Sequence, residues 1–171
     1  MATRTQLQLE PLSGCIHEKM LQSEYEQQRR RIHTLCRWML HDANEALRME
    51  MRIFIDAWSA TAGEERAGED RPGFPVIDDD RLAAAFALHF RGLFAGDSRA
   101  SAGAEAKKTV ASTGLREAVR QLPAQQRLLY LLHELEGYPP AVLGEWLDLD
   151  AAYCSQLIHQ ARLRLRDAVA A

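Results

Sequence analysis

The strongest structural signal in this chain is the segment from residue 115 to 169, LREAVRQLPAQQRLLYLLHELEGYPPAVLGEWLDLDAAYCSQLIHQARLRLRDAV. Its apolar residues recur at the spacing of short amphipathic α-helices. Pro139 and Pro140 suit the first turn of a helix, where a missing N–H costs nothing, so we expect a helix from there through Leu147. A turn over residues 148–150 and a second helix follow. This spacing predicts a helix-turn-helix, the motif that places its second helix in the major groove of DNA.

The second helix of this pair has two contrasting faces. Asp150 is a good N-cap because its carboxylate can accept hydrogen bonds from the free N–H groups of the next turn. We expect the stripe that repeats at intervals of three and four to be buried: Cys154, Ile158, Ala161, Leu165 and Ala168. The other side carries the candidate DNA-binding residues: Tyr153, Ser155, Gln156, His159, Gln160, Arg162 and Arg164. The alternative for Tyr153 and His159 is an ordinary solvated helix surface.

The same segment carries a series of short motifs in a fixed order. They are Leu122-Pro123, Arg127 followed by the apolar run 128–132, Glu136-Gly137, His159-Gln160-Ala161-Arg162 and Leu165-Arg166. Together they resemble the C-terminal promoter-binding domain of the extracytoplasmic-function (ECF) sigma factors, in the sigma-70 family. The resemblance implies an RNA polymerase sigma factor that directs transcription initiation and whose last helix binds the −35 promoter element.

Residues 18–58 contain two more helical patterns, broken at His41-Asp42-Ala43-Asn44. The first stripe is Tyr25, Ile32, Leu35, Cys36, Met39 and Leu40, and the second is Ala46, Met49, Ile53, Phe54, Ala57 and Trp58. This segment resembles the core-polymerase-binding domain of the same sigma factors, through Met39-Leu40-His41-Asp42, Ala46, Phe54 and Trp58. The resemblance implies a polymerase-binding face made of Asp42, Glu45, Arg48, Met49 and Arg52. Without the C-terminal match, a generic helical hairpin would explain the pattern equally well.

Several positions depart from the family pattern. The family presents an acidic residue and a glutamine to the polymerase clamp where this chain has Arg48 and Met51. Residues 64–80, EERAGEDRPGFPVIDDD, hold seven acidic residues against two arginines, and DNA phosphates repel such a loop unless it is only a solvated excursion. The next helix, expected over residues 81–94, keeps Phe86, Phe90 and Phe94, which we expect to be core residues rather than wedges between bases.

The predicted DNA-binding helix is also less basic than the family pattern. Ser155, Leu157 and Gln160 occupy positions that are commonly basic, and from residue 114 onward six arginines face seven acidic residues. Two hypotheses therefore stay open. The first is a divergent sigma factor. The second is a sigma-like regulatory protein without promoter binding, which sequesters an anti-sigma factor or partners another sigma factor. A stand-alone helix-turn-helix repressor would leave the N-terminal resemblance accidental and has no dimerisation heptad.

Composition predicts an all-α protein of two small helical domains. The 171 residues show no alternating strand pattern, and an Ala/Ser/Gly-rich stretch divides them into a domain at 15–98, a flexible linker at 99–113 and a domain at 114–171. No apolar run approaches the roughly 20 residues that span a bilayer, and the polar start is not a signal peptide. Three cysteines without a C-x-x-C motif fit a reducing compartment. We expect a cytoplasmic protein.

Catalytic and metal-binding patterns are weak. Cys15, His17, His33, Cys36 and His41 are metal-ligand types, but they lack the paired spacing of zinc sites, and Cys36 falls on a buried stripe. The sequence has neither a nucleophile–base pattern nor a phosphate-binding glycine loop. We expect no enzyme activity, no metal and no cofactor. The expected partners are core RNA polymerase, through its beta-prime clamp and beta flap, promoter DNA and an anti-sigma factor, with no membrane.

Overall fold

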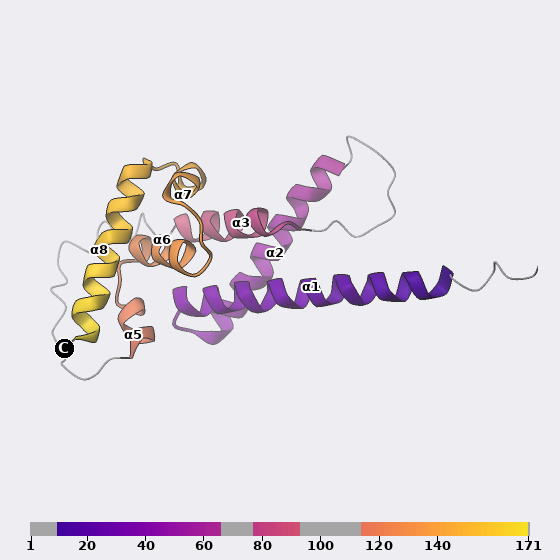
Figure 1. Cartoon of the computed structure of the whole chain (residues 1–171), viewed down its shortest axis with the longest axis horizontal. Helices are drawn as coiled ribbons and strands as arrows, with labels where there is room; N and C mark the ends of the chain where they lie inside the picture. Colours follow the sequence, from indigo (N-terminus) through magenta and orange to yellow (C-terminus); the bar gives the residue numbers. More distant parts are fainter. Residues whose placement is uncertain (1–9, 66–76, 93–113, 171) are drawn as a thin grey trace, which may run out of the picture.

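The computed structural model describes residues 10–65, 77–92 and 114–170, with side chains described for 22–60 in the first range. These ranges are all-α, as predicted, and contain no strand (Figure 1). The helices are α1 (Glu10–Met39), α2 (Ala43–Glu65), α3 (Asp79–Arg91), α5 (Leu115–Arg120), α6 (Ala124–Glu134), α7 (Pro140–Leu147) and α8 (Ala151–Val169). None of these described helices is long and apolar enough to cross a membrane. The predicted linker, 99–113, lies outside the described residues.

The first three helices form one packing unit. α1 and α2 make a hairpin whose break falls at the predicted position, because Asp42 accepts a hydrogen bond from the backbone N–H of Glu45 (2.7 Å) and thereby caps α2. α3 packs on α2, and its own N-cap is Asp78, which accepts from the N–H of Arg81 (2.7 Å). The core of this unit consists of large apolar side chains that are fully buried: Ile32, Leu35, Ile53, Leu82, Phe86 and Phe90.

Two aromatic residues predicted on the buried stripes are in fact exposed. Tyr25 is 51% exposed and Trp58 is 44% exposed. Tyr25 packs against the ring of Phe54, with centroids 5.5 Å apart, and still remains half exposed. The helical period was therefore right, and the predicted depth of burial was wrong at these two positions. Phe94 lies outside the described residues.

The last four helices form the second packing unit. α8 packs against α5, α6 and α7. The predicted buried stripe of α8 is confirmed at Cys154, Ile158, Ala161 and Leu165, while Ala168 is half-buried against the same core. Gly137 ends the α6 region with a positive φ of 80°, which glycine adopts without strain. That turn lets the N–H of Tyr138 donate to the carbonyl of Leu132 (3.1 Å).

The two units pack against each other. α1 contacts α5 and α6, and α3 contacts α6 and α7 (Figure 1). Arg127 of α6 is buried and donates to the carbonyl of Met39 at the end of α1 (2.8 Å), to the carbonyl of Leu122 (2.9 Å) and to that of Arg120. Arg120 in turn donates to the carbonyl of Arg37 (3.2 Å). These arginines satisfy backbone carbonyls at the end of α1 and around α5, where helix hydrogen bonding stops.

Candidate nucleic-acid and polymerase interfaces

The helix-turn-helix of α7 and α8 depends on a close backbone approach at Gly144. A Cβ atom at this position would lie 2.6 Å from the carbonyl oxygen of Leu149, so only glycine fits without a shift of the turn. Asp148 adopts the left-handed conformation (φ 56°, ψ 50°) and ends α7. The N–H of Leu149 then donates to the carbonyl of Gly144 (2.9 Å). The predicted turn over residues 148–150 is confirmed.

Asp150 caps the second helix, as predicted. Its carboxylate accepts hydrogen bonds from the N–H groups of Ala152 (2.8 Å) and Tyr153 (3.1 Å), two of the donors that have no partner within α8. The helix therefore begins at a fixed position relative to α7. The side chains of its first three turns are presented from a rigid framework.

The seven candidate DNA-binding residues lie on both flanks of the exposed surface of α8. At 100° per residue, Tyr153, Gln156, Gln160 and Arg164 share one flank, while Ser155, His159 and Arg162 share the other. Gln156 and His159 lie farthest from the buried stripe and are exposed. Ser155 is exposed as well, but its hydroxyl donates to the carbonyl of Ala151 (2.9 Å).

Two of the candidates are held by α6. Gln160 accepts a hydrogen bond from the side chain of Gln126 (2.9 Å), and Arg162 forms an ion pair with Glu134 through two nitrogens, at 2.7 and 2.5 Å. Arg162 can therefore contact a phosphate only by releasing or sharing Glu134. Sequence spacing gave no sign of these two interactions.

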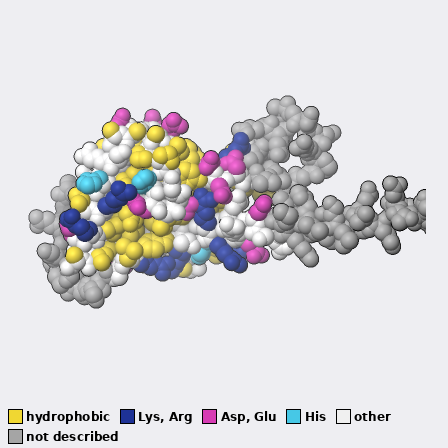
Figure 2. Space-filling view, in the orientation of Figure 1, with side chains coloured by type: hydrophobic (Ala, Val, Ile, Leu, Met, Phe, Trp, Pro, Cys, Tyr) yellow, Lys and Arg dark blue, Asp and Glu magenta, His cyan; other side chains and the backbone are white. Residues whose placement is uncertain are grey.

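The end of the motif that is predicted to read DNA is acidic in character. No lysine or arginine occurs from residue 128 to residue 161, whereas this stretch holds five acidic residues. In Figure 2, the face over α6 and α8 carries hydrophobic side chains with a few histidine and basic side chains among them, rather than a continuous basic band. Positive charge on α8 begins at Arg162 and continues at Arg164 and Arg166, toward its C-terminal end. Phosphate attraction is correspondingly weak.

The five candidate polymerase-binding residues lie at the start of α2. Glu45, Arg48 and Arg52 are exposed and share one face of the helix. Asp42 is exposed and also caps the helix, so its carboxylate has a structural function. Met49 is half-buried and packs against the core, which limits it to the edge of any interface on this face.

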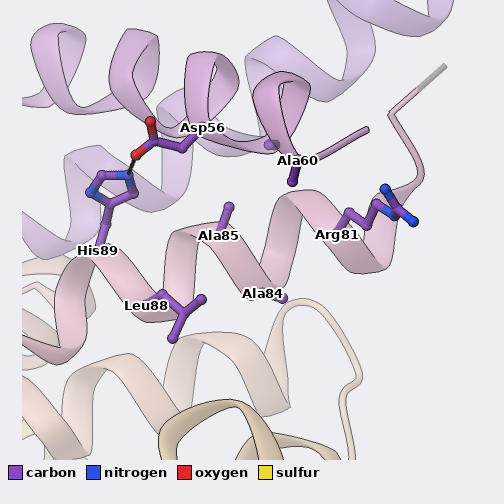
Figure 3. A pocket seen from close by; sticks show the side chains of 8 residues that line it. Asp56, Ala60, Arg81, Ala84, Ala85, Leu88 and His89 are labelled. Carbon is purple, nitrogen blue, oxygen red and sulfur yellow. Dashed lines mark hydrogen bonds and ion pairs between the residues drawn. The ribbon is translucent and has the colours of Figure 1, made fainter. Parts of the chain in front are cut away.

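A shallow cavity of about 370 Å³ lies between α2 and α3, with the hydrogen-bonded side chains of Asp56 and His89 (2.7 Å) at one end (Figure 3). Alanines make up half of its lining residues, and Arg81 lies at the other end. Phe86 and Phe90 are fully buried and do not line it. The prediction that these two aromatics belong to the core is confirmed.

The structure accounts in other ways for two of the residues considered as metal ligands, His33 and Cys36. The imidazole Nδ1 of His33 lies 2.6 Å from the buried carboxylate of Glu50, which also accepts from Arg29 (2.9 Å). Cys36 is fully buried, and this burial raises the pKa of its thiol to about 12. A thiol with so high a pKa is a poor metal ligand at neutral pH. The side chains of Cys15 and His17 lie outside the described ones.

Comparison with known proteins relates the C-terminal unit to a described protein family. Residues 113–165 match the family described as Sigma-70, region 4. The C-terminal unit therefore contains a segment that is similar to region 4 of the sigma-70 proteins. This match includes the whole of α7 and most of α8, so the glycine turn and the N-cap of Asp150 lie within the segment that is similar to region 4.

A solved structure extends the likeness to the rest of the fold. The sigma factor RpoE from Bartonella quintana, in complex with the anti-sigma factor NepR, is similar over 88% of this chain and 97% of its own, with a TM-score of 0.59 and 14% sequence identity. At this identity the likeness concerns the fold, including the three N-terminal helices. No curated protein sequence matches the chain.

Proposed function

We propose that this protein is an RNA polymerase sigma factor of the ECF type, which directs transcription initiation by binding core polymerase and promoter DNA. The observation that carries the proposal is the rigidly capped helix-turn-helix of α7 and α8 within the region 4 match. Such a module holds promoter DNA in a fixed position and orientation, and it supplies no catalytic nucleophile or base. The proposed activity therefore involves no enzyme chemistry and no cofactor, and it takes place where the polymerase is, in the cytoplasm.

Polymerase contact is assigned to the exposed face of α2 that carries Glu45, Arg48 and Arg52, with Asp42 and Met49 at its edge. The clamp of the beta-prime subunit is the proposed partner of this face. The basic C-terminal end of α8 is proposed to contact the beta flap or DNA phosphates. Because the similar RpoE structure holds an anti-sigma factor, we propose a partner of that kind here too.

Promoter reading is assigned to the N-terminal half of α8. Gln156 is exposed, and a glutamine can pair with adenine through two hydrogen bonds that are worth about 1–3 kcal/mol of discrimination. Gln156→Ala should relax promoter choice by this amount, whereas Arg164→Ala should weaken binding to every sequence and reduce its salt dependence. Binding of the holoenzyme to promoters with single-base changes measures both effects. Gln27→Ala on α1, another exposed glutamine, is the matched control, and equal effects of Gln27→Ala and Gln156→Ala would contradict the assignment.

Promoter binding by both units requires them to separate. Arg91 at the end of α3 pairs with Asp148 in the turn of the helix-turn-helix (3.3 Å), so the N-terminal unit directly contacts the motif assigned to promoter reading. The −10 and −35 promoter elements lie about 25 base pairs apart, or about 85 Å at 3.4 Å per base pair. We propose that the units of residues 15–98 and 114–171 move apart about the linker at 99–113 when the protein engages polymerase.

One polar network would have to break for this movement. Arg31 of α1 pairs with Glu136 of the α6–α7 loop, with Asp79 at the start of α3 (3.0 Å) and with the hydroxyl of Tyr138 (3.3 Å). The same hydroxyl donates to the carboxylate of Asp80 (3.0 Å). Arg31 therefore connects helices of both units, and its loss should favour the separated form.

Arg31→Gln should increase the population of separated molecules by about tenfold or more, because a hydrogen-bonded, partly buried charge contributes about 1.5–3 kcal/mol. Small-angle X-ray scattering should show a larger radius of gyration, and limited proteolysis should cut residues 99–113 faster. The control is Arg30→Gln, since Arg30 is exposed and pairs only within α1, with Glu26 (3.6 Å). A scattering profile of Arg31→Gln that matches that of Arg30→Gln would argue against the network as a latch.

The second candidate function is a sigma-like regulator without promoter binding. The acidic reading end of the helix-turn-helix and the pairing of Arg162 with Glu134 favour it. The DNA affinity of the variant Glu134→Gln distinguishes between the two candidate functions. In a promoter-binding protein it frees Arg162 and removes a nearby negative charge, so DNA affinity should rise, whereas a regulator that never contacts DNA should show no change.

A further inference from the structure

Three arginines of the C-terminal unit hold the end of α1. The guanidinium of Arg116 lies over the ring of Trp38, with its central carbon 5.8 Å from the ring centroid. Arg120 and Arg127 donate to carbonyls in the last turn of α1, over 3.2 and 2.8 Å. The carbonyl oxygens at the C-terminal end of a helix carry partial negative charge and lack partners within the helix. The end of α1 therefore occupies these guanidinium groups much as an anion would.

This contact engages half of the basic residues of the C-terminal unit. Residues 114–171 contain six arginines and no lysine, and Arg116, Arg120 and Arg127 are three of the six. The other three lie at the C-terminal end of α8, where Arg162 and Arg166 pair with acidic side chains. The closed form, in which the two units pack against each other, therefore offers few free cations to DNA. Its weak attraction for phosphates follows in part from the packing of the units.

Arg120 is incompletely satisfied in the closed form. Its Nε atom is buried and has no hydrogen-bond partner within the described residues. A buried donor without an acceptor is destabilising, and a charged one more so. Arg127 differs, because it also donates to the carbonyl of Leu122 in its own unit (2.9 Å). Separation of the units would therefore free Arg116 and Arg120, whereas Arg127 would keep partners.

The two freed arginines share one face of α5. They are four residues apart, which is about one helical turn. α5 packs beside the C-terminal end of α8, the other basic part of the unit (Figure 1). The acidic residue of α5, Glu117, lies about 100° from Arg116 around the helix axis. Positive charge therefore dominates this end of the unit once α1 is removed.

We propose that Arg116 and Arg120 form a phosphate-binding surface for DNA, which α1 covers in the closed form. A guanidinium can bind a phosphate through two parallel hydrogen bonds, whereas Arg120 donates only one to α1 among the described residues. Phosphate contacts carry no sequence information and supply general DNA affinity, which the acidic end of the helix-turn-helix lacks. The proposal adds a DNA-binding element outside the helix-turn-helix, and it rests on the proposed separation of the units.

The test measures binding of the full chain to a short labelled DNA duplex of random sequence, by fluorescence anisotropy at several salt concentrations. Arg116→Gln should reduce the slope of log affinity against log salt by about 0.9, the contribution of one phosphate contact, and the double variant with Arg120→Gln by about 1.8. The control is Arg30→Gln, which removes the same charge from an exposed position on α1 and should leave the slope unchanged. A slope for the double variant equal to that of Arg30→Gln would show that these arginines only hold α1, and would overturn the proposal.

A second measurement tests the covering by α1. Arg31→Gln, which should favour the separated form, should bind the duplex up to about tenfold more tightly, because apparent affinity follows the population of the competent form. The double variant of Arg116 and Arg120 should also separate the units, yet bind more weakly, and a purely structural role cannot give these opposite effects.

Saturating DNA should also speed backbone hydrogen exchange at residues 36–40 of the wild-type protein, since it draws the arginines away from the end of α1. Unchanged exchange there, or Arg31→Gln binding no more tightly than the wild type, would overturn the proposal. The duplex carries no promoter and polymerase is absent, so a failure here is distinct from a failure of promoter-dependent transcription.

Discussion

Phe86→Ala should lower the free energy of unfolding by about 3–5 kcal/mol, the usual result of truncating a buried phenylalanine. Its ring is fully buried and packs 4.8 Å from the ring of Phe90, in the core that joins α3 to the α1–α2 hairpin. Urea unfolding followed by circular dichroism measures the loss. Leu88→Ala provides the control, since Leu88 lies on the same helix but is exposed, and should change stability by less than about 1 kcal/mol. Similar losses in both variants would contradict this description of the core.

Arg127→Met should lower the free energy of unfolding by about 3–5 kcal/mol. The substitution keeps most of the side-chain stem but removes the charged donors from three buried or partly buried carbonyls. One of those carbonyls, at Met39, belongs to the other unit, so the variant should also loosen the contact between α1 and α6. Chemical unfolding and hydrogen exchange of the backbone around α5 and the end of α1 measure the two effects.

The control for Arg127 is Arg166→Met. Arg166 is exposed and pairs only with its neighbour Asp167 (2.9 Å), so its replacement should cost less than about 1 kcal/mol. If Arg127→Met lowered the free energy of unfolding no more than Arg166→Met does, the hydrogen bonds from the buried guanidinium of Arg127 to these carbonyls would not be stabilising.

Local sequence signals predicted the parts of this fold that depend on neighbouring residues. The two prolines before α7, the turn over 148–150, the N-cap of Asp150 and the buried stripe of α8 each follow from interactions within a few residues. The break between α1 and α2 follows in the same way from the capping by Asp42. Such features need no knowledge of the tertiary arrangement.

Contacts between distant residues were not predictable in this way. Arg31 and Glu136 are separated by 105 positions, and each alone resembles an ordinary surface charge in the sequence. The same applies to Gln160 and Arg162, whose bonds to α6 reduce their freedom to contact DNA. Periodicity also cannot give the depth of a stripe, which is why Tyr25 and Trp58 are more exposed than predicted.

The acidic segment 64–80 was interpreted as a loop that repels phosphate or as a solvated excursion. Its last three residues have structural functions instead: Asp78 caps α3, Asp79 pairs with Arg31, and Asp80 accepts a hydrogen bond from Tyr138. Part of the negative charge in this segment is thus compensated within the protein, and residues 66–76 lie outside the described ones. The electrostatic objection to DNA binding is weaker here than composition suggested.

The central claim, that this protein is a sigma factor, is tested most directly by reconstitution. Purified protein is mixed with core RNA polymerase from the same bacterium and a library of promoter fragments, and transcripts are sequenced. The account predicts a stable holoenzyme and transcripts that start at a defined set of promoters sharing −35 and −10 elements. It also predicts that Gln156→Ala broadens this set. A protein that binds an anti-sigma factor tightly, yet yields no promoter-dependent transcript with core polymerase, would contradict the account and identify the regulator without promoter binding.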